Sequence, residues 1–213
     1  MLFAMSYSCG KDSTLALHEM VAAGHRPAAL VVMVNRAAGR SYFHGADDGM
    51  LDRYEAALGI PMLRCPSDGA DYAGAFERGL AQARAMGAEG ACFGDIDIEN
   101  NRRWEEDRCA AVGLRPFFPL WQRGREENVA ELLRLGYRCL IKSVNTALLP
   151  RSLLGTYLDG DAVAVMKAAG ADVCGENGEY HTLTVDGPVF QRPLAFQTGD
   201  ILEFDGYAAI DVR

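Results

Sequence analysis

Short apolar runs and amphipathic segments alternate along the first part of the chain. Residues 1–7 and 28–34 are apolar runs of strand length, and the segment between them places Leu15, Ala16 and Met20 at helical spacing. A strand, a helix and a second strand in this order predict two parallel strands joined by a right-handed crossover.

The alternation continues to about residue 120. The further predicted elements are, in order, a helix at 50–60, a strand at 61–65, a helix at 72–90, a strand at 91–95 and a helix at 101–112. Gly59 marks the C-cap of the first of these helices, and Pro61 blocks its continuation. Alternating strands and helices are typical of an α/β fold, so we expect a doubly wound parallel sheet.

The pattern changes beyond Trp121. The elements predicted there are a helix at 126–135, a strand at 139–144 and a helix at 161–169. Residues 199–213 then alternate apolar and polar side chains, as half-buried strands do. We therefore expect two domains, 1–122 and 123–213, of which the second is a smaller α+β domain. No flexible linker separates them, so the two domains should pack together.

Composition places the chain among folded globular proteins. Of its 213 residues, 49% are hydrophobic and 23% are charged. No run approaches the ~18 consecutive apolar residues of a membrane span, and the N-terminal segment lacks the basic region of a signal peptide, so we expect a cytoplasmic protein. The net charge of −8 argues against a surface that binds a nucleic-acid backbone and favours a small-molecule role.

Six cysteines are scattered along the chain, at positions 9, 65, 92, 109, 139 and 174. No two of them form a C-x-x-C pair, so their spacing suggests neither a structural zinc site nor a disulfide framework. We expect most of them to be buried, reduced thiols.

The stretch "SYSCGKDSTLAL" joins the first predicted strand to the first predicted helix. Such a junction presents unpaired backbone N–H groups at the positive end of a helix dipole, which is a site for anions. Gly10 permits close approach of the backbone, and Lys11 supplies a positive charge. Ser8 and Ser13 supply hydroxyl groups, and Asp12 can hold a magnesium ion or cap the helix. The alternative is an ordinary capped helix, because the spacing fits neither a Walker loop nor a dinucleotide-binding G-x-G-x-x-G.

Within this stretch, "SCGKDS" resembles the S-G-G-K-D-S pyrophosphatase loop (PP-loop) of the adenine nucleotide alpha-hydrolase-like superfamily, whose members cleave ATP between its α- and β-phosphates. Three further segments in the same order resemble one family within it, the diphthine-ammonia ligases and their bacterial relatives. They are "SYFHG" (41–45), "GDI" with "RWEEDRCAAVGLRPFFPLW" (94–121), and "CGENGEYHTLTVDGPVF" (174–190). The resemblance covers nearly the whole chain.

The resemblance implies a two-domain ATP-dependent ligase. In that family ATP adenylates a carboxylate with release of pyrophosphate, and ammonia then displaces AMP to form an amide. The implied cofactors are ATP and Mg²⁺, and Asp12 would hold the ion. The resemblance also implies that Met33 lies at the adenine, that His44 lies beside the nucleotide, and that Gly94 and Asp95 lie in the ligand crevice at the sheet edge. The loop residues that would contact the phosphates are Ser8, Cys9, Gly10, Lys11, Asp12 and Ser13.

The chain departs from the family pattern in two segments. Cys9 stands where the loop usually has its first Gly, so either this position needs no positive φ or the loop geometry is altered. One hypothesis is that the helix N-terminus lowers the pKa of the Cys9 thiol and makes it reactive. The alternative, which we favour, is that Cys9 is only a small residue that fits this position. The segment "ENGEYHT" replaces E-G-G-E-Y-E-T, and its Asn177 and His181 suggest a different substrate.

This second segment concentrates polar side chains in one Gly-interrupted stretch. Glu176, Asn177, Glu179, Tyr180 and His181 are predicted to bind the second substrate, with the two carboxylates binding an amine and acting as general bases. The alternative is a polar turn before a strand. The run does not resemble an EF-hand loop, and one His with two Glu is weak support for a transition-metal site.

A basic cluster lies on the helix predicted at 101–112. Arg102 and Arg103 either reach the ATP phosphates or the substrate acid, or form ion pairs of little energetic weight on a solvated face. His44, which follows an aromatic pair, is either a nucleotide contact or a structural hydrogen-bonding residue.

The sequence therefore predicts a ligase that makes an acyl-adenylate and transfers ammonia or an amine to it, with Lys11, Asp12, Glu176 and Glu179 as catalytic residues. Its expected partners are ATP, a carboxylate-bearing small molecule or protein, and the nitrogen donor, without nucleic acid or membrane; a homodimer is compatible with the sequence. Two alternatives stay open. One is an RNA-modifying ATP pyrophosphatase, and the other is a nucleotide-binding sensor that ligates nothing.

Overall fold

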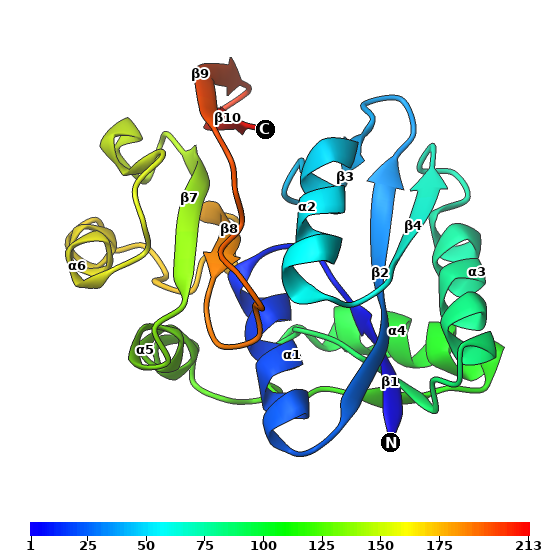
Figure 1. Ribbon diagram of the computed structural model, residues 1–213. Helices are drawn as coiled ribbons and strands as arrows, with labels where there is room; N and C mark the ends of the chain where they lie inside the picture. The colour runs from blue at the N-terminus through cyan, green and yellow to red at the C-terminus, as the bar shows by residue number, and fades with distance from the viewer.

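The first half of the chain folds as a parallel sheet with helices on both faces, in a computed structural model that describes residues 1–213 (Figure 1). Its elements are β1 (Leu2–Ser6), α1 (Lys11–Ala22), β2 (Arg26–Asn35), β3 (Arg40–Ser41), α2 (Asp48–Leu58), β4 (Met62–Ser67), α3 (Tyr72–Ala85), β5 (Gly90–Cys92), α4 (Glu99–Val112) and β6 (Arg115–Phe117). The parallel strands lie in the order β4-β2-β1-β5-β6, and the short β3 pairs antiparallel with the end of β2.

The side-chain pattern of the strands explains the two layers of helices. Phe3 and Met5 on β1 pack into one hydrophobic cluster with residues of α1 and α2, while Ala4 packs into another with residues of α3 and α4. Because successive side chains of a strand point to opposite faces, a strand buried on both faces must be apolar throughout, as β1 and most of β2 are. The predicted doubly wound sheet is confirmed.

The predicted elements of this half are present, with differences at their ends. The strand predicted at 91–95 ends at Cys92, because the chain leaves the sheet to pack Gly94 against the start of α1. The helix predicted at 72–90 ends at Ala85, and Gly87 follows with φ 99°. The loop expected between β2 and α2 contains the two-residue strand β3.

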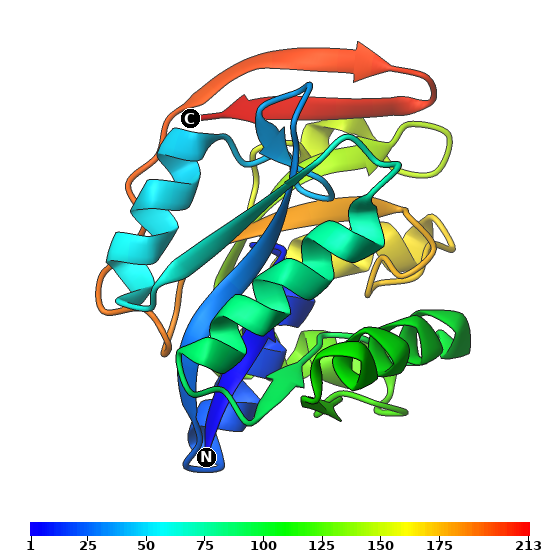
Figure 2. The ribbon, with the colours of Figure 1, turned by 90° about the vertical axis from the view of Figure 1, so that its right-hand side faces the viewer.

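The second half of the chain forms a separate antiparallel sheet with helices beside it. Its elements are α5 (Arg125–Arg134), β7 (Arg138–Asn145), the 3-10 helix η1 (Arg151–Leu153), α6 (Gly160–Ala168), β8 (Tyr180–Asp186), β9 (Thr198–Phe204) and β10 (Tyr207–Val212). The strand order is β8-β7-β10-β9. Figure 2 shows the β9–β10 hairpin extending across the top of the molecule. The predicted α+β character is confirmed, and the boundary near residue 122 stays a prediction.

The two sheets meet along the loop that precedes α1. The Thr184 N–H donates to the Cys9 carbonyl (2.9 Å), and the Lys11 N–H donates to Thr182 Oγ1 (3.1 Å). One hydrophobic cluster of 43 buried residues runs through both halves, so β8 packs onto the loop as part of a common core. The predicted close packing of the two parts is therefore observed.

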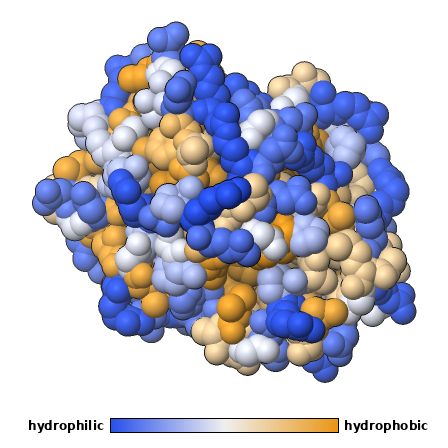
Figure 3. Space-filling model, in the orientation of Figure 1, coloured by the Kyte–Doolittle hydropathy of each residue, from blue (hydrophilic) through white to orange (hydrophobic).

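Hydrophobic and hydrophilic residues are interspersed over the face shown in Figure 3. None of the helices combines the length and the hydropathy that a membrane-spanning segment needs.

Candidate functional site

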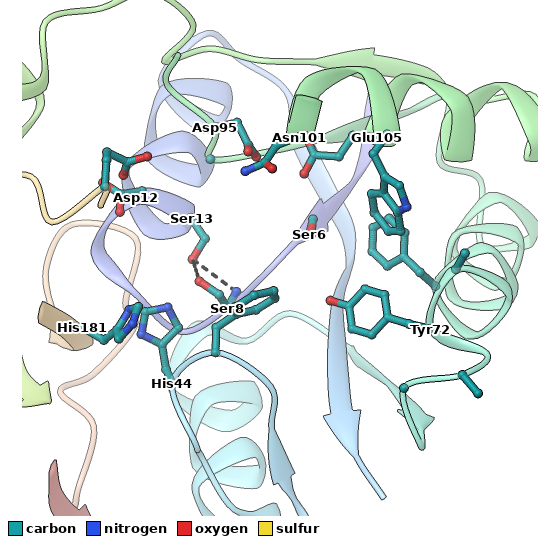
Figure 4. Close-up of a pocket in the computed structure, with 18 residues that line it drawn as sticks. Ser6, Ser8, Asp12, Ser13, His44, Tyr72, Asp95, Asn101, Glu105 and His181 are labelled. Carbon is teal, nitrogen blue, oxygen red and sulfur yellow. Dashed lines mark hydrogen bonds between the residues drawn. The ribbon is translucent and has the colours of Figure 1, made fainter. Parts of the chain in front are cut away.

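A cavity of about 670 Å³ opens at the carboxyl ends of β1 and β5 (Figure 4). The chain adds strands to one side of β1 first and to the other side afterwards, so these ends form the switch point at which open α/β sheets bind ligands. The cavity is lined by Ser6, Ser8, Asp12, Ser13, Phe43, His44, Gly69, Ala70, Tyr72, Ala73, Phe76, Gly94, Asp95, Asn101, Trp104, Glu105, Glu176 and His181.

The loop between β1 and α1 is a tight turn through Cys9 and Gly10. Cys9 has φ 70°, in the left-handed region, so the position does require the conformation that Gly adopts most easily. Cys9 is fully buried, and burial raises the pKa of its thiol far above the ordinary range. The hypothesis of a thiol activated by the helix N-terminus is therefore wrong, because desolvation outweighs the positive charge nearby.

Two glycines let neighbouring segments approach this loop. A Cβ on Gly10 would lie 2.6 Å from Cε1 of His44, so only Gly leaves room for the imidazole. A Cβ on Gly94 would lie 2.8 Å from the backbone nitrogen of Ser13. The loop before α1 is thus enclosed by the His44 segment and by the segment that follows β5.

Hydrogen-bond donors of the loop face the cavity. No side chain caps α1 at Gly10, and the N–H groups of Asp12 and Ser13 have no partner within the protein. The hydroxyls of Ser8 and Ser13 lie 3.1 Å apart, as the dashed line in Figure 4 shows. Unpaired amides and hydroxyls at a helix N-terminus form an anion-binding arrangement.

Lys11 is not among the residues that line the cavity. Its side chain is buried, with Nζ 2.6 Å from Asp12 Oδ2 and 3.7 Å from the Cys174 sulfur. Burial lowers the pKa of Lys11, but Asp12, Tyr180 and Cys174 outweigh this and raise the pKa above its ordinary value. The ammonium is therefore charged and held beside Asp12, and its predicted contact with the phosphates stays a prediction.

The cavity lining contains four carboxyl groups and no lysine or arginine. Burial, together with neighbouring Asp95, raises the pKa of Glu105 to about 11, and burial raises the pKa of Asp95 as well. Burial and the charge of Asp12 raise the pKa of Glu176 to about 7. Carboxyls crowded in this way retain protons unless a cation compensates their charge.

Asp12 and Glu176 are the residues best placed to hold a metal ion. Their carboxylate oxygens and the sulfur of Cys174 lie within 4.8 Å of one another. Carboxylate oxygens suit Mg²⁺, whereas a thiol with a raised pKa does not. Asp12 and Glu176 would hold the ion through their carboxylate oxygens.

The residues of the polar segment 176–181 fall into two groups: some are held by hydrogen bonds within the protein, and others line the cavity. Glu179 is buried and accepts hydrogen bonds from Asp172 N (3.4 Å), Asn177 N (3.0 Å) and Asn177 Nδ2 (3.1 Å). The Tyr180 hydroxyl donates to the Val173 carbonyl (2.6 Å). Of the five residues predicted to bind the second substrate, only Glu176 and His181 line the cavity.

Arg125 fixes this segment against the loop that follows β5. Its guanidinium donates to Asp97 (2.7 and 2.8 Å) and to Asp172 (2.5 Å). Asn177 lies at the edge of the same network, 3.4 Å from Arg125 Nη1. Glu179 and Arg125 thus hold in place the loop that carries Glu176.

His44 and His181 meet edge to face at one side of the cavity, with ring centroids 5.3 Å apart (Figure 4). Burial lowers the pKa of both imidazoles, and the proximity of positive side chains lowers it further. Both rings are therefore neutral near pH 7. His44 Nδ1 is buried without a hydrogen-bond partner.

Other predicted contacts lie outside the cavity. Met33 is buried in β2 and borders a small cavity of about 40 Å³ that shares Ser6 and Ser8 with the main one. Arg102 pairs with Glu106 and stacks on Trp121, 4.8 Å from its ring centroid. Arg103 pairs with Glu99 on the surface, so the ion-pair interpretation of these arginines is supported.

The sequence analysis missed the aromatic wall of the cavity. Tyr72 and Phe76 come from the first turns of α3, and Trp104 from α4; the rings of Phe76 and Trp104 stack with centroids 5.4 Å apart. An aromatic pair four residues apart at the start of a helix that follows a strand is the only local signal of this wall. Aromatic side chains in a cavity wall suit a nucleobase, which can pack against their rings.

The family models that match the chain cover nearly all of it. Residues 1–116 match the diphthamide synthase N-terminal domain, and residues 125–212 match the diphthamide synthase C-terminal domain.

Curated relatives match over similar lengths. The human protein named diphthine--ammonia ligase is 26% identical over 227 residues, which span 95% of this chain and 85% of the human one. The Danio rerio protein of the same name is 27% identical over 217 residues, which span 88% of this chain and 83% of that one.

Among the similar solved structures is one titled as a predicted subunit of tRNA methyltransferase from Methanocaldococcus jannaschii. The match covers 90% of this chain and 99% of that chain, with 12% identity and a TM-score of 0.46.

Proposed function

Because this chain belongs to the diphthamide synthase family, we propose that it is an ATP-dependent ligase that adenylates a carboxylate, releases pyrophosphate and transfers ammonia or an amine to the acyl group. The names of its curated relatives support ligase activity. The observation that carries the proposal is the cavity itself, in which unpaired loop amides, paired serine hydroxyls and an aromatic wall surround one space.

In the proposed arrangement the triphosphate lies on the loop before α1 and the adenine lies against the aromatic wall. The N–H groups of Asp12 and Ser13 and the hydroxyls of Ser8 and Ser13 donate hydrogen bonds to phosphate oxygens. Donors fixed in place by the fold stabilise the charge that develops on the departing pyrophosphate without reorganising during the reaction.

A divalent cation completes this site. In their ionised forms the carboxyls of the lining would repel a nucleotide triphosphate, and no lysine or arginine lines the cavity to offset that charge. Asp12 and Glu176 offer the oxygen ligands that Mg²⁺ prefers, so the residues present fit this ion. When bound, Mg²⁺ neutralises phosphate charge and supports pyrophosphate departure.

Lys11 acts through Asp12. Its ammonium pairs with the Asp12 carboxylate at 2.6 Å and so fixes the position of that carboxylate at the phosphates. We assign Lys11 as a positioning residue in this state of the protein.

His181 is the group best placed to accept a proton from the nitrogen nucleophile. Like Glu176, it lines the cavity, and its lowered pKa keeps the imidazole neutral near pH 7, so that it can accept a proton. Glu179, predicted as a second base, has its oxygens occupied within its own loop, and we therefore propose that it orders this loop.

The test is the fate of ATP labelled at the α-phosphate. The purified protein is incubated with Mg²⁺, ammonium and a fractionated cell extract, since the acid is unidentified. We expect the wild type to form AMP and pyrophosphate. Formation of both products should be lost in Asp12→Asn. It should be retained in the control variant Asp107→Asn, which changes an exposed carboxylate on α4. ATP binding without AMP would indicate a sensor, stimulation by RNA alone would indicate an RNA-modifying enzyme, and ADP would contradict pyrophosphatase chemistry.

A further inference from the structure

A second cavity, of about 500 Å³, adjoins the first. It lies between the segment that contains β3 and the sheet formed by β7, β10 and β9. The two cavities share Phe43, His44 and His181, so the two histidines stand at the neck between them. A molecule in the second cavity would therefore lie against the same two histidines that line the first.

The second cavity contains a cation that no acid neutralises. Lys142 on β7 is only 7% exposed, and its Nζ donates to the carbonyls of His44 (2.6 Å) and Gly45 (2.9 Å). No carboxylate lies within 4.0 Å of it, whereas Arg40 in the same lining pairs with Asp211 (3.0 Å). A lysine ammonium has three N–H groups, so one of them is left for a ligand. A buried charge without a counter-ion is costly and is stabilised by an anion that binds to it.

The rest of the lining is largely apolar. Leu202 and Phe204 on β9 are 52% and 55% exposed, and Phe204 stacks with Tyr207 at a centroid distance of 6.2 Å. Phe43 at the neck is 63% exposed. Large apolar side chains exposed together around one cavity indicate a ligand with an apolar body.

We propose that this second cavity binds the acid that the ligase activates, a carboxylate with an apolar body, with its carboxylate at the neck on the free N–H of Lys142 and its body along β9 and β10. The assignment rests on the proposed function. It places the carboxylate beside His44 and His181, at the entrance to the cavity assigned to ATP. The carboxylate oxygen can then attack the α-phosphorus, forming the mixed anhydride and breaking the bond to pyrophosphate.

The ionisation of Lys142 gives the site a pH signature. Burial, and then the charge of Arg40, lower the pKa of Lys142 to about 8, while Asp211, Cys9 and Asp47 act in the opposite direction. His44 and His181, which also face the neck, have lowered pKa values and stay neutral over this range. A bound carboxylate stabilises the ammonium, so affinity for the acid should fall as the pH rises above about 8.

The probes are 4-phenylbutyrate and 4-phenylbutanamide, which differ in charge and share an apolar body. Titration calorimetry on the full chain at pH 7 should show at least a tenfold preference for the acid in the wild type. Lys142→Met should abolish the preference, and Lys167→Met, at an exposed lysine on α6 paired with Glu126, should keep it. Phe204→Ser, at a position that is 55% exposed, should weaken binding of both probes.

Equal binding of acid and amide by the wild type, or an unchanged preference in Lys142→Met, would overturn the assignment. A concentration-dependent dimer that excludes both probes would also overturn it, because a second copy would then cover the cavity. The binding measurement needs no turnover. If the protein prefers the acid but forms no AMP, the result contradicts the proposed function alone. If it forms AMP but shows no preference for the acid, the result contradicts only the assignment of this site.

Discussion

The imidazole of His44 occupies the space that a side chain on Gly10 would need, with the ideal Cβ position 2.6 Å from Cε1 and 2.8 Å from Nε2. Gly10 itself has an ordinary extended backbone, with φ −86°. The requirement for glycine at this position therefore comes from the neighbouring ring. The His44 carbonyl is in turn held by Lys142 from the second sheet, so the loop before α1 is braced by a residue of each half of the chain.

This contact predicts a coupled pair of substitutions. Gly10→Ala should destabilise the protein by about 1–3 kcal/mol, because a methyl group is forced against a packed ring. In a His44→Ala background the same change should cost less than about 0.5 kcal/mol, since the space is then free. Urea unfolding of the four proteins measures the coupling. Additive effects would show that backbone conformation, rather than the ring, requires glycine here.

The left-handed conformation of Cys9 predicts a ranking of replacements. Cys9→Gly should change the free energy of unfolding by less than about 1 kcal/mol, because relief of the positive φ offsets the lost thiol packing. Cys9→Val should destabilise by more than about 2 kcal/mol, since a β-branched residue is strained at φ 70°. Thermal and urea denaturation would contradict the account if Val were tolerated as well as Gly.

Glu176 and Glu179 lie three positions apart and should respond differently to the same change. Glu176→Gln should reduce AMP formation at least tenfold and leave stability nearly unchanged, because this carboxyl lines the cavity. Glu179→Gln should destabilise by about 1–3 kcal/mol, because the new amide faces N–H groups that need an acceptor. Activity and unfolding measured on both variants test this separation, and reversed results would exchange the two roles.

The buried cysteines predict a loss of stability at alkaline pH. All six are free and buried, and burial raises the pKa of each thiol, to about 11 for Cys65 and Cys139. Above the unfolded pKa of about 8.5 the unfolded chain binds fewer protons than the native one, so the free energy of unfolding falls with pH, by up to about 1.4 kcal/mol per pH unit for each thiol.

Cys92→Ala tests this slope. Cys92 is fully buried, and burial raises the pKa of its thiol, so between pH 9 and 10 the variant should lose stability less steeply than the wild type. In the native protein a thiol reagent should label all six cysteines only as fast as the chain opens. Rapid labelling of Cys9 in native protein would restore the hypothesis of an activated thiol at the helix N-terminus.

Local patterns predicted much of the fold. The apolar runs at β1 and β2 and the helical spacing of Leu15 and Met20 reflect burial against a sheet, and that burial repeats at the period of each element. The loop before α1 was found for the same reason, since an anion-binding turn is built from consecutive residues. The ends of helices and strands were predicted less accurately than their positions. Tertiary packing, such as that of Gly94 on α1, decides where a strand ends.

The parts of the site that the sequence did not predict depend on contacts between distant segments. His44 and His181 meet only because β8 packs onto the loop, and Lys142 reaches the His44 carbonyl from the second sheet. The orientation of Lys11 toward Asp12 and Cys174 likewise depends on the segment that precedes β8. Within one short segment, composition could not distinguish Glu176 at the cavity from Glu179 in the turn.

The most direct test of the central claim is a crystal structure with Mg²⁺ and α,β-methylene-ATP, which cannot be cleaved between the α- and β-phosphates. We predict phosphate oxygens on the N–H groups of Asp12 and Ser13, Mg²⁺ on Asp12 and Glu176, and the adenine against Tyr72. A nucleotide bound outside this cavity, or one whose phosphates avoid the loop before α1, would contradict the account.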